Sequence, residues 1–258
     1  TFTYDGDTPQ DARQAIRTQG DIVITNPDML HTGILPHHTK WLNFFQNLKF
    51  VVIDELHSYR GVFGSHMSNV LRRLDRICRF YGSRPQFICC SATIANPKEL
   101  AEKLTEREIL LIDQSGAPSS EKLFVFYNPP VVNKELGIRR SPIHSARELA
   151  SPFIERGIQT ILFATSRLNV EILNKYLKDR FEKSLEQRGS IRGYRGGYLP
   201  EVRREIEKGL REKEVKAVAS TNALELGIDI GDLDVCFITG YPGTIASTYQ
   251  QAGRVGRR

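Results

Sequence analysis

Short apolar runs alternate with segments of helical periodicity along the first half of the chain. The runs are residues 21–25 (DIVIT), 49–54 (KFVVID), 85–91 (PQFICCS) and 107–113 (REILLID). Because they are apolar almost throughout, they are typical of strands buried on both faces. Residues 63–82 place apolar side chains at helical spacing and end in glycine, which predicts a helix. Strands that alternate with such helices predict parallel pairing through right-handed crossovers.

A segment rich in Gly, Pro and Ser interrupts this alternation at residues 113–122 (DQSGAPSSEK). A second series follows, with strands expected near 122–127, 159–164, 190–194, 215–220 and 234–239 and helices at 141–156, 166–187 and 198–212. We therefore expect an α/β protein of two tandem domains with mainly parallel sheets, residues 1–114 and 122–258, joined by a linker at 115–121. Ligand sites in such domains lie at the carboxyl ends of the strands.

The composition is typical of a globular protein without a membrane-spanning helix. Hydrophobic residues make up 40% of the 258 residues and charged residues 26%, as in water-soluble globular proteins. No apolar run approaches the roughly 20 residues of a membrane helix, and the first residues do not resemble a signal peptide. A cytoplasmic location without membrane contact is expected. The four cysteines form no CxxC pair, so reduced core thiols are favoured over a metal site or a disulfide.

The net charge of +6 is unevenly distributed. Residues 1–120 hold equal numbers of basic and acidic side chains, so the whole excess lies in residues 121–258. A positive half suits a polyanionic partner, and a solvated surface rich in Lys and Arg explains the charge equally well.

Asp54 and Glu55 directly follow the apolar run at 49–53. Such an acidic pair either caps a following helix or holds Mg²⁺ and orients a water molecule beside a nucleotide. Three further segments bear on this choice: SAT at Ser91–Thr93, TNALELGID from Thr221 to Asp229, and QQAGRVGR from Gln250 to Arg257. Each alone is also explained as a polar turn, a glycine turn or a basic tail.

Together, and in this order, these segments resemble the motifs of the superfamily 2 helicases, the DEAD/DEAH-type ATPases that depend on nucleic acid. Longer stretches resemble the DNA helicases with a cysteine-rich zinc-binding domain after the motor, the mitomycin repair factor A type. These are residues 3–13, 24–36, 52–74, 91–104, 127–141 and 220–234. The resemblance spans nearly the whole chain and implies two tandem RecA-like domains. The cysteine-rich domain has no counterpart among the four cysteines.

The resemblance implies ATP and Mg²⁺ as cofactors. Asp54 would hold Mg²⁺ through water, and Glu55 would share this metal site and polarise the attacking water. His57, Ser91 and Thr93 would link the nucleotide state to the relative position of the domains, with Ser91 and Thr93 near the nucleotide.

In the second domain, the resemblance assigns nucleotide contacts to three segments. Gly227 and Asp229 would meet the ribose or the hydrolytic site, and Gln250 would contact phosphate or the first domain. Arg254 and Arg257 would reach the γ-phosphate, with Arg257 favoured as the arginine finger, a group that typically adds about 10³ to 10⁵ in rate.

The partner implied is nucleic acid, either single-stranded DNA or a duplex with a single-stranded tail, with RNA left open. Polar and glycine-containing turns would hold phosphates without reading sequence. The matching positions are Gly6, Thr25, Asn26 and Pro27 in the first domain and Thr165, Ser166, Arg167, Gly196 and Thr221 in the second. Residues 193–198 (GYRGGY) either stack on bases or form a plain turn.

The phosphate-cradling loop GxxxxGK[ST] is absent, since the chain contains no Gly-Lys dipeptide. We therefore expect the first domain to lack its amino-terminal part, and we expect these residues alone to hydrolyse little ATP. Two functions remain open. One is the motor of an ATP-dependent helicase, for which the resemblance favours DNA as the substrate and a role in DNA repair, nucleoid-associated if the source is bacterial. The other is a non-catalytic nucleic-acid-binding module of the same fold.

Overall fold

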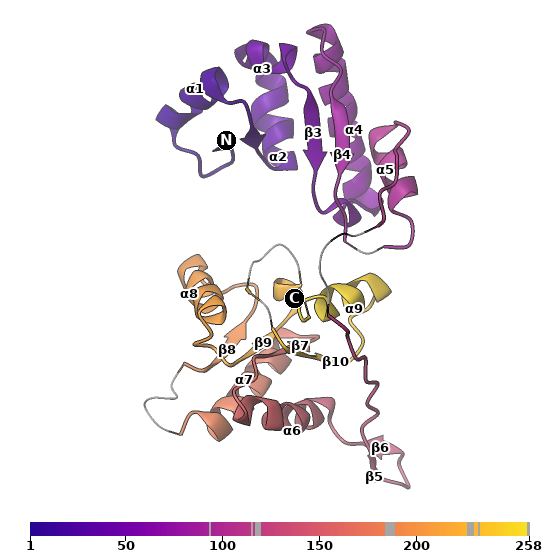
Figure 1. Ribbon diagram of the computed structural model, residues 1–258, viewed down its shortest axis with the longest axis vertical. Coiled ribbons are helices and arrows are strands. Elements are labelled where there is room, and N and C mark those ends of the chain that lie inside the picture. Colours follow the sequence, from indigo (N-terminus) through magenta and orange to yellow (C-terminus); the bar gives the residue numbers. More distant parts are fainter. Residues whose placement is uncertain are drawn as a thin grey trace. The chain divides into compact units, whose positions relative to one another are not determined.

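The computed structural model describes residues 1–92, 94–114, 116, 120–183, 189–225, 230–231 and 233–256. The chain divides into two compact units, Thr1–Gln114 and Ser115–Arg258 (Figure 1). The division falls in the segment where the sequence predicts a linker. Assignment of the two units to functional domains with a linker at 115–121 remains a prediction.

The first unit contains two pairs of parallel strands. β1 (Phe2–Thr3) pairs with β2 (Val23–Ile24), and β3 (Phe50–Ile53) pairs with β4 (Gln86–Cys89). The α-helices are α1 (Gln10–Gln19), α2 (Pro27–Met29), α3 (Leu42–Gln46), α4 (Gly61–Phe80) and α5 (Pro97–Thr105). A π-helical turn η1 (Leu30–Ile34) and two 3₁₀ segments, η2 (Leu35–Trp41) and η3 (Leu56–Ser58), complete the unit.

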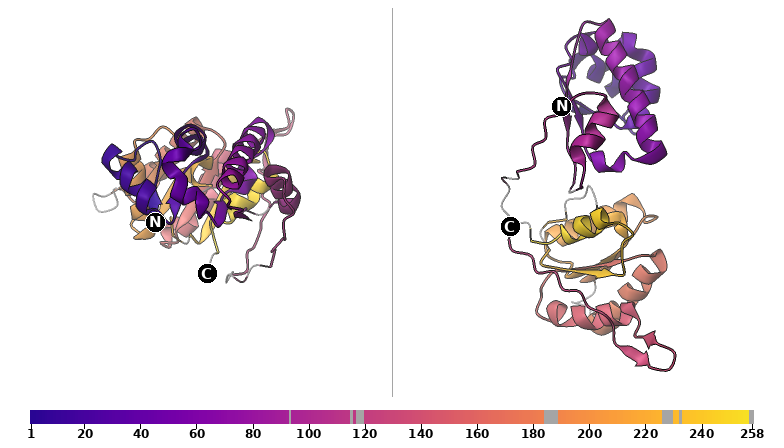
Figure 2. Two further views of the ribbon diagram at one scale, coloured as in Figure 1. Left: turned by 90° about the horizontal axis from the view of Figure 1, so that it is seen from above. Right: turned by 90° about the vertical axis from the view of Figure 1, so that its right-hand side faces the viewer.

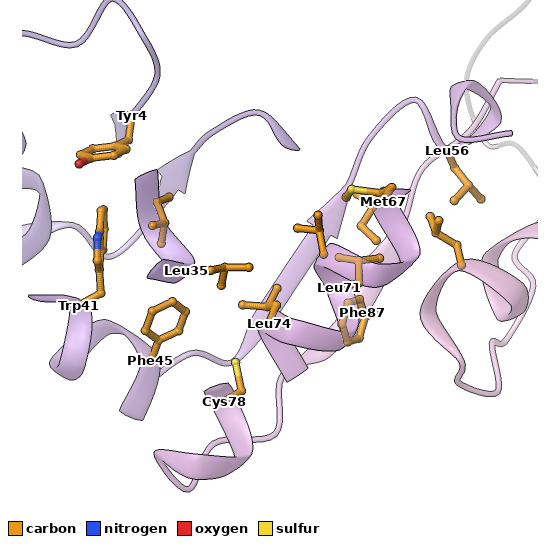
Figure 3. Close-up of a cluster of buried hydrophobic side chains, with 14 of the residues drawn as sticks. Tyr4, Leu35, Trp41, Phe45, Leu56, Met67, Leu71, Leu74, Cys78 and Phe87 are labelled. Carbon is orange, nitrogen blue, oxygen red and sulfur yellow. The ribbon is translucent and has the colours of Figure 1, made fainter. Parts of the chain in front are cut away.

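One hydrophobic core joins both strand pairs of the first unit (Figure 3). Tyr4, which follows β1, meets Trp41 edge to face with ring centroids 4.9 Å apart. The helix predicted from periodicity is α4, and it buries the expected face against β3 and β4 through Met67, Leu71 and Leu74. Burial of this face contributes the packing that positions the loop between β3 and α4.

The strands of the first unit are not buried on both faces as predicted. Phe50 and Val52 on β3 and Ile88 on β4 are exposed, whereas the alternate residues face the core. Residues 107–113 form no strand, and Leu110 is 86% exposed. The physical reason is the lack of a partner: within the described residues no strand lies beside this apolar run, so the run does not form a strand.

The second unit is built on a four-stranded parallel sheet with strand order β10-β7-β9-β8. Its strands are β7 (Thr160–Ala164), β8 (Ile191–Tyr194), β9 (Ala217–Ser220) and β10 (Val235–Thr239). Helices α6 (Pro142–Glu155), α7 (Arg167–Phe181), α8 (Pro200–Arg211) and α9 (Ile245–Ala252) and the 3₁₀ turn η5 (Asn222–Leu224) surround it. The predicted α/β class and parallel pairing are confirmed.

Both faces of this sheet are covered, as the right-hand view of Figure 2 shows. One core packs α6 and α7 on the sheet, with Leu173 and Leu162 fully buried. The other packs α8 and η5 on the opposite face around Ile161 and Val218. The strand order reverses between β7 and β10, and such a switch point opens a crevice at the carboxyl ends of the strands.

Before this sheet the chain is extended. Residues 122–127, predicted as a strand, form none, and Phe126 is 95% exposed. An antiparallel hairpin of β5 (Val131–Asn133) and β6 (Ile138–Arg139) follows. All four cysteines are free; Cys78 is buried and Cys90 is exposed, so not all are core thiols. Among the described helices, none is long and apolar enough to span a bilayer.

Candidate nucleotide and nucleic-acid sites

The acidic pair lies where the sequence predicts, at the carboxyl end of β3. The Asp54 side chain is exposed, and its Oδ1 accepts the Glu55 backbone N–H at 2.8 Å. The backbone ladder continues past the strands, since Leu56 N–H donates to the Cys90 carbonyl at 2.9 Å. The segment that carries Ser91 is thereby held beside the pair. Ser91 itself is exposed, and its hydroxyl donates to the Ala92 carbonyl.

Glu55 adopts a left-handed backbone conformation, with φ 50° and ψ 41°. This region is unfavourable for a side chain without a local polar contact to the backbone. The conformation begins η3 directly after the strand, with Ser58 N–H bonded to the Glu55 carbonyl at 2.8 Å. Local strain of this kind gathers at functional sites when the surrounding structure enforces it.

His57 connects Glu55 with the segment after β4. Its Nε2 lies 3.4 Å from Glu55 Oε2, and its Nδ1 accepts the Ala92 backbone N–H at 3.2 Å. Because Nδ1 is an acceptor, a neutral ring carries its proton on Nε2, the atom that faces the carboxylate. The buried imidazole therefore fixes the carboxylate relative to the SAT segment. The role predicted for His57, linking the nucleotide state to the relative position of the domains, remains a prediction.

Tyr59 was not identified from the sequence, although it follows the acidic pair in the same loop. Its ring packs against Phe63 with centroids 5.4 Å apart. Burial raises the pKa of Tyr59, and the nearby carboxylates of Asp54 and Glu55 raise it further. The phenol is therefore a neutral neighbour of the pair and does not offset its negative charge.

The acidic pair fits Mg²⁺ held together with substrate phosphates. Among the described residues, no group of three or more His, Cys, Asp or Glu side chains could hold a metal by itself. Mg²⁺ commonly uses one or two carboxylates and takes its remaining ligands from water and phosphates. The exposed Asp54 carboxylate at a strand end meets this requirement, with Glu55 beside it.

The four nucleic-acid residues predicted in the first unit occupy neighbouring loops after β1 and β2. Thr25 Oγ1 donates to the Tyr4 carbonyl at 2.7 Å and ties the two loops together. Asn26 Oδ1 accepts the Met29 backbone N–H at 2.8 Å and caps α2, where Pro27 begins the turn. Gly6 is exposed in the first loop. The structure brings these residues to one sheet edge, and their contact with nucleic acid remains a prediction.

In the second unit, all five predicted nucleic-acid residues line one cleft of about 490 Å³ at the carboxyl ends of the strands. Segments after all four strands contribute to it. They supply Thr165, Ser166 and Arg167 after β7, Gly196 after β8, Thr221 and Asn222 after β9, and Gly240, Tyr241, Pro242 and Gly243 after β10. The sequence analysis missed Asn222, although it directly follows Thr221. It also missed residues 240–243, because their position beside the motifs depends on the strand order.

Helix starts give the cleft its chemistry. Ser166 Oγ accepts the Asn169 backbone N–H at 3.1 Å and caps α7. Thr244 Oγ1 accepts the Ser247 backbone N–H at 3.0 Å and caps α9, directly after Gly243. Helix amino termini carry partial positive charge and free amides, which favour anions. The exposed Arg167 side chain adds a full positive charge at the same place.

The GYRGGY turn is anchored to the protein. Arg195 Nε and the Tyr198 hydroxyl both donate to Glu171 Oε1, at 2.7 and 2.9 Å, and the guanidinium lies over the Tyr198 ring. Burial alone would raise the pKa of Glu171, but these hydrogen bonds lower it below its ordinary value. Tyr194 is fully buried. Tyr194 ends β8 and Tyr198 closes the turn, so both tyrosines make their contacts within the protein, and these contacts hold Gly196 at the cleft.

Arg254, which is predicted to reach the γ-phosphate, is buried in this structure. It is 5% exposed, and its Nε and Nη2 donate to the Glu225 main-chain carbonyl at 3.2 and 2.7 Å. Gln251, which the sequence analysis did not single out, donates from Nε2 to Glu225 Oε2 at 2.9 Å and also lines the cleft. In this structure Arg254 therefore anchors the chain at Glu225. Gln250 lies half-buried on α9 beside these residues.

Four predicted site residues lie outside the described part of the chain. They are Thr93, Gly227, Asp229 and Arg257. Their roles, including the arginine finger assigned to Arg257, remain predictions from the motifs.

Two helicase domain families match most of the chain. The DEAD/DEAH box helicase family matches residues 1–100, and the helicase conserved C-terminal domain matches residues 143–258. The chain is 64% identical over 258 residues to the ATP-dependent helicase YprA of Bacillus subtilis and covers 34% of that protein. It is 42% identical over 261 residues to the ATP-dependent helicase HRQ1 of Saccharomyces cerevisiae, covering 99% of this chain and 24% of the relative.

Solved structures of helicases also match the chain. A crystal structure of the DUF1998 helicase MrfA bound to DNA matches the whole chain with a TM-score of 0.96 at 64% identity, over 34% of that protein. MrfA bound to DNA and AMPPNP matches with a TM-score of 0.95, over 36% of that protein. The chain thus spans about a third of these two relatives, YprA and MrfA. Its two α/β units are RecA-like, and the chain belongs to the superfamily 2 helicases of the MrfA type.

Proposed function

We propose that the chain is the motor part of a DNA helicase, which couples ATP hydrolysis to movement along one strand. The observation that carries the proposal is the cleft of the second unit, where segments after all four strands meet at two helix starts. Such a surface binds successive phosphates and reads no base edge, which suits a motor that must pass any sequence.

The first unit supplies the hydrolytic groups. Asp54 presents an exposed carboxylate for Mg²⁺, and Mg²⁺, when bound, neutralises charge on the phosphates of ATP. Glu55 accepts a proton from, or orients, the attacking water, and His57 holds its carboxylate at 3.4 Å. YprA and HRQ1 are named ATP-dependent, and MrfA was solved with AMPPNP. Both support ATP as the nucleotide.

DNA is the substrate we propose, as single strands or duplexes with a single-stranded tail. Support comes from the MrfA structures, which contain DNA. We extend the proposal to DNA repair at the chromosome, on the resemblance to the mitomycin repair type. Binding through phosphates releases counterions, so affinity is expected to fall steeply with rising salt concentration.

Replacement of Glu55 by Gln tests the hydrolytic assignment. Because the chain has no Gly-Lys dipeptide, we expect these 258 residues alone to hydrolyse little ATP, and the assay uses a chain extended by a phosphate-binding loop. Glu55→Gln is expected to lower DNA-stimulated ATP turnover by at least about 10²-fold, since it removes the proton acceptor while keeping the side-chain shape. ATP affinity should stay within about twofold, as the lost group acts on water.

Glu108→Gln is the matched control, because Glu108 is an exposed carboxylate of the same unit. It should leave turnover unchanged. Undiminished turnover in Glu55→Gln would refute the assignment of Glu55. Equal unwinding of RNA and DNA duplexes by the active protein would refute the preference for DNA.

A further inference from the structure

Tyr241 is an exposed aromatic side chain in the cleft of the second unit. It directly follows β10, lines the cleft with the residues after β7 and β9, and is 64% exposed. Gly240 and Gly243 on either side have positive φ angles of 86° and 96°, so the loop takes a shape that few other sequences allow. Within the described residues, no hydrogen bond or ring contact is recorded for its side chain.

The other aromatic rings around the cleft are committed to the protein. Phe163 is 2% exposed, Tyr194 lies in the core, and Tyr198 is held by Glu171. Among the described residues that line the cleft, Tyr241 is thus the aromatic ring open to a ligand.

The remaining lining residues suit phosphates and leave the bases without a partner. Thr165, Ser166 and Thr221 offer short hydroxyls and backbone amides, and Arg167 offers a charge. A strand whose phosphates lie on these groups needs a separate surface for its bases. A tyrosine ring provides one, because every base has a face that stacks on an aromatic ring.

We propose that Tyr241 stacks on a base of the strand whose phosphates occupy the cleft. The proposal rests on the nucleic-acid binding proposed above and specifies its ligand: a single strand with unstacked bases. In a duplex each base face is already covered by its neighbours, so this contact favours single strands over duplexes. It does not select a base, since stacking tolerates every sequence.

The test measures binding of a labelled single-stranded oligothymidine to the chain by fluorescence anisotropy at fixed salt concentration. Tyr241→Ala is expected to weaken binding about fivefold to 150-fold, the range for one lost base–aromatic stack. Tyr241→Phe keeps the ring and should bind as the wild type does. In a series of strands that each lack the base at one position, we expect the wild type to bind one strand more weakly than the intact strand, by a similar factor. Tyr241→Ala should show no further loss with that strand.

Two control variants separate the stacking proposal for Tyr241 from the proposal that the cleft binds nucleic acid. Arg167→Ala should weaken binding to intact and abasic strands equally, because it removes a phosphate contact. Arg156→Ala removes an exposed arginine of the same unit away from the cleft and should change nothing. If neither Arg167→Ala nor Tyr241→Ala affects binding, the cleft is not the nucleic-acid site.

If Arg167→Ala weakens binding and Tyr241→Ala does not, the cleft binds nucleic acid and the stacking proposal is wrong. Loss in Tyr241→Phe equal to that in Tyr241→Ala would assign the contact to the hydroxyl and also overturn stacking. Equal abasic effects in wild type and Tyr241→Ala would do the same. Unchanged far-UV circular dichroism of each variant serves as the folding control.

Discussion

At the scale of single residues, Tyr194 shows how burial changes a side chain that the sequence leaves ambiguous. Its ring is fully buried, and its hydroxyl donates to Glu207 Oε1 at 2.6 Å. Burial, followed by the hydrogen bond to the Glu207 carboxylate, raises the pKa of Tyr194 to about 12. The folded protein therefore keeps this proton at pH values where an unfolded tyrosine, with a pKa near 10, has lost it.

The raised pKa predicts a loss of stability in alkali. Between about pH 10 and pH 12 the folded state binds more protons at Tyr194 than the unfolded state, so the free energy of unfolding falls as pH rises. Tyr194→Phe lacks this titration, and its own pH dependence should be shallower in this window. Urea unfolding followed by far-UV circular dichroism at several pH values measures both proteins.

Trp41 gives an internal control, because it is the single tryptophan and lies in the first unit. Its fluorescence transition should have the same pH dependence in both proteins. A stability difference between wild type and Tyr194→Phe that stays constant from pH 10 to pH 12 would contradict the assigned pKa.

The position of a site residue could be predicted from the sequence where neighbouring residues of one motif determine it. It could not be predicted where contacts with distant segments determine it. Asp54 and Glu55 were placed correctly at the end of β3, because an apolar strand ending in two carboxylates constrains both. Gln251 and Tyr241 were missed, since their neighbours are brought in by other strands. The burial of Arg254 depends on the path of the chain at Glu225, which no local pattern shows.

At the scale of elements, periodicity predicted the second unit to within a few residues at most ends. The helix expected at 141–156 is α6 (Pro142–Glu155), and the strand expected at 234–239 is β10. The predictions failed at 107–113 and 122–127, which are apolar and unpaired within the described residues. Strand propensity is expressed only through a neighbouring strand, and the sequence does not show which edges are paired.

Ser166 caps helix α7 and also lines the cleft, and two substitutions separate its effect on stability from its effect on DNA binding. Its hydroxyl caps α7, so Ser166→Ala should lower the free energy of unfolding of the second unit by about 0.5–2 kcal/mol. Ser166→Asp keeps an acceptor for the Asn169 N–H and should restore most of that stability. It also places a negative charge in the cleft, so it should bind single-stranded DNA more weakly than Ser166→Ala.

Urea unfolding and anisotropy titrations measure these two quantities on the same samples. Ser166→Asp binding DNA as tightly as wild type would show that phosphates do not approach the start of α7. Equal stability of all three proteins would show that the cap contributes nothing measurable.

At the scale of the whole molecule, each unit has its own hydrophobic core. The first core joins both strand pairs around Trp41 and α4, and the second unit has one core on each face of its sheet. Units with separate cores are expected to unfold as separate cooperative transitions.

Matched core substitutions test this independence. Leu74→Ala in the first unit and Leu173→Ala in the second remove buried leucines, and each should destabilise its own unit by about 2–5 kcal/mol. Leu74→Ala should shift the Trp41 fluorescence transition. Leu173→Ala should leave that transition in place and shift only the remaining component of the circular dichroism signal. A shift of both components by either substitution would mean that the chain unfolds as one unit.

The backbone at Glu55 has a consequence for any attempt to make this protein more robust. A left-handed conformation costs about 1–2 kcal/mol for a residue with a β-carbon, and glycine avoids that penalty. Selection for thermal resistance alone would therefore favour glycine here and remove the carboxylate to which we assign the attacking water. At this position stability and the proposed catalytic role favour different residues, so a chain that keeps Glu55 is expected to be less stable than one with glycine.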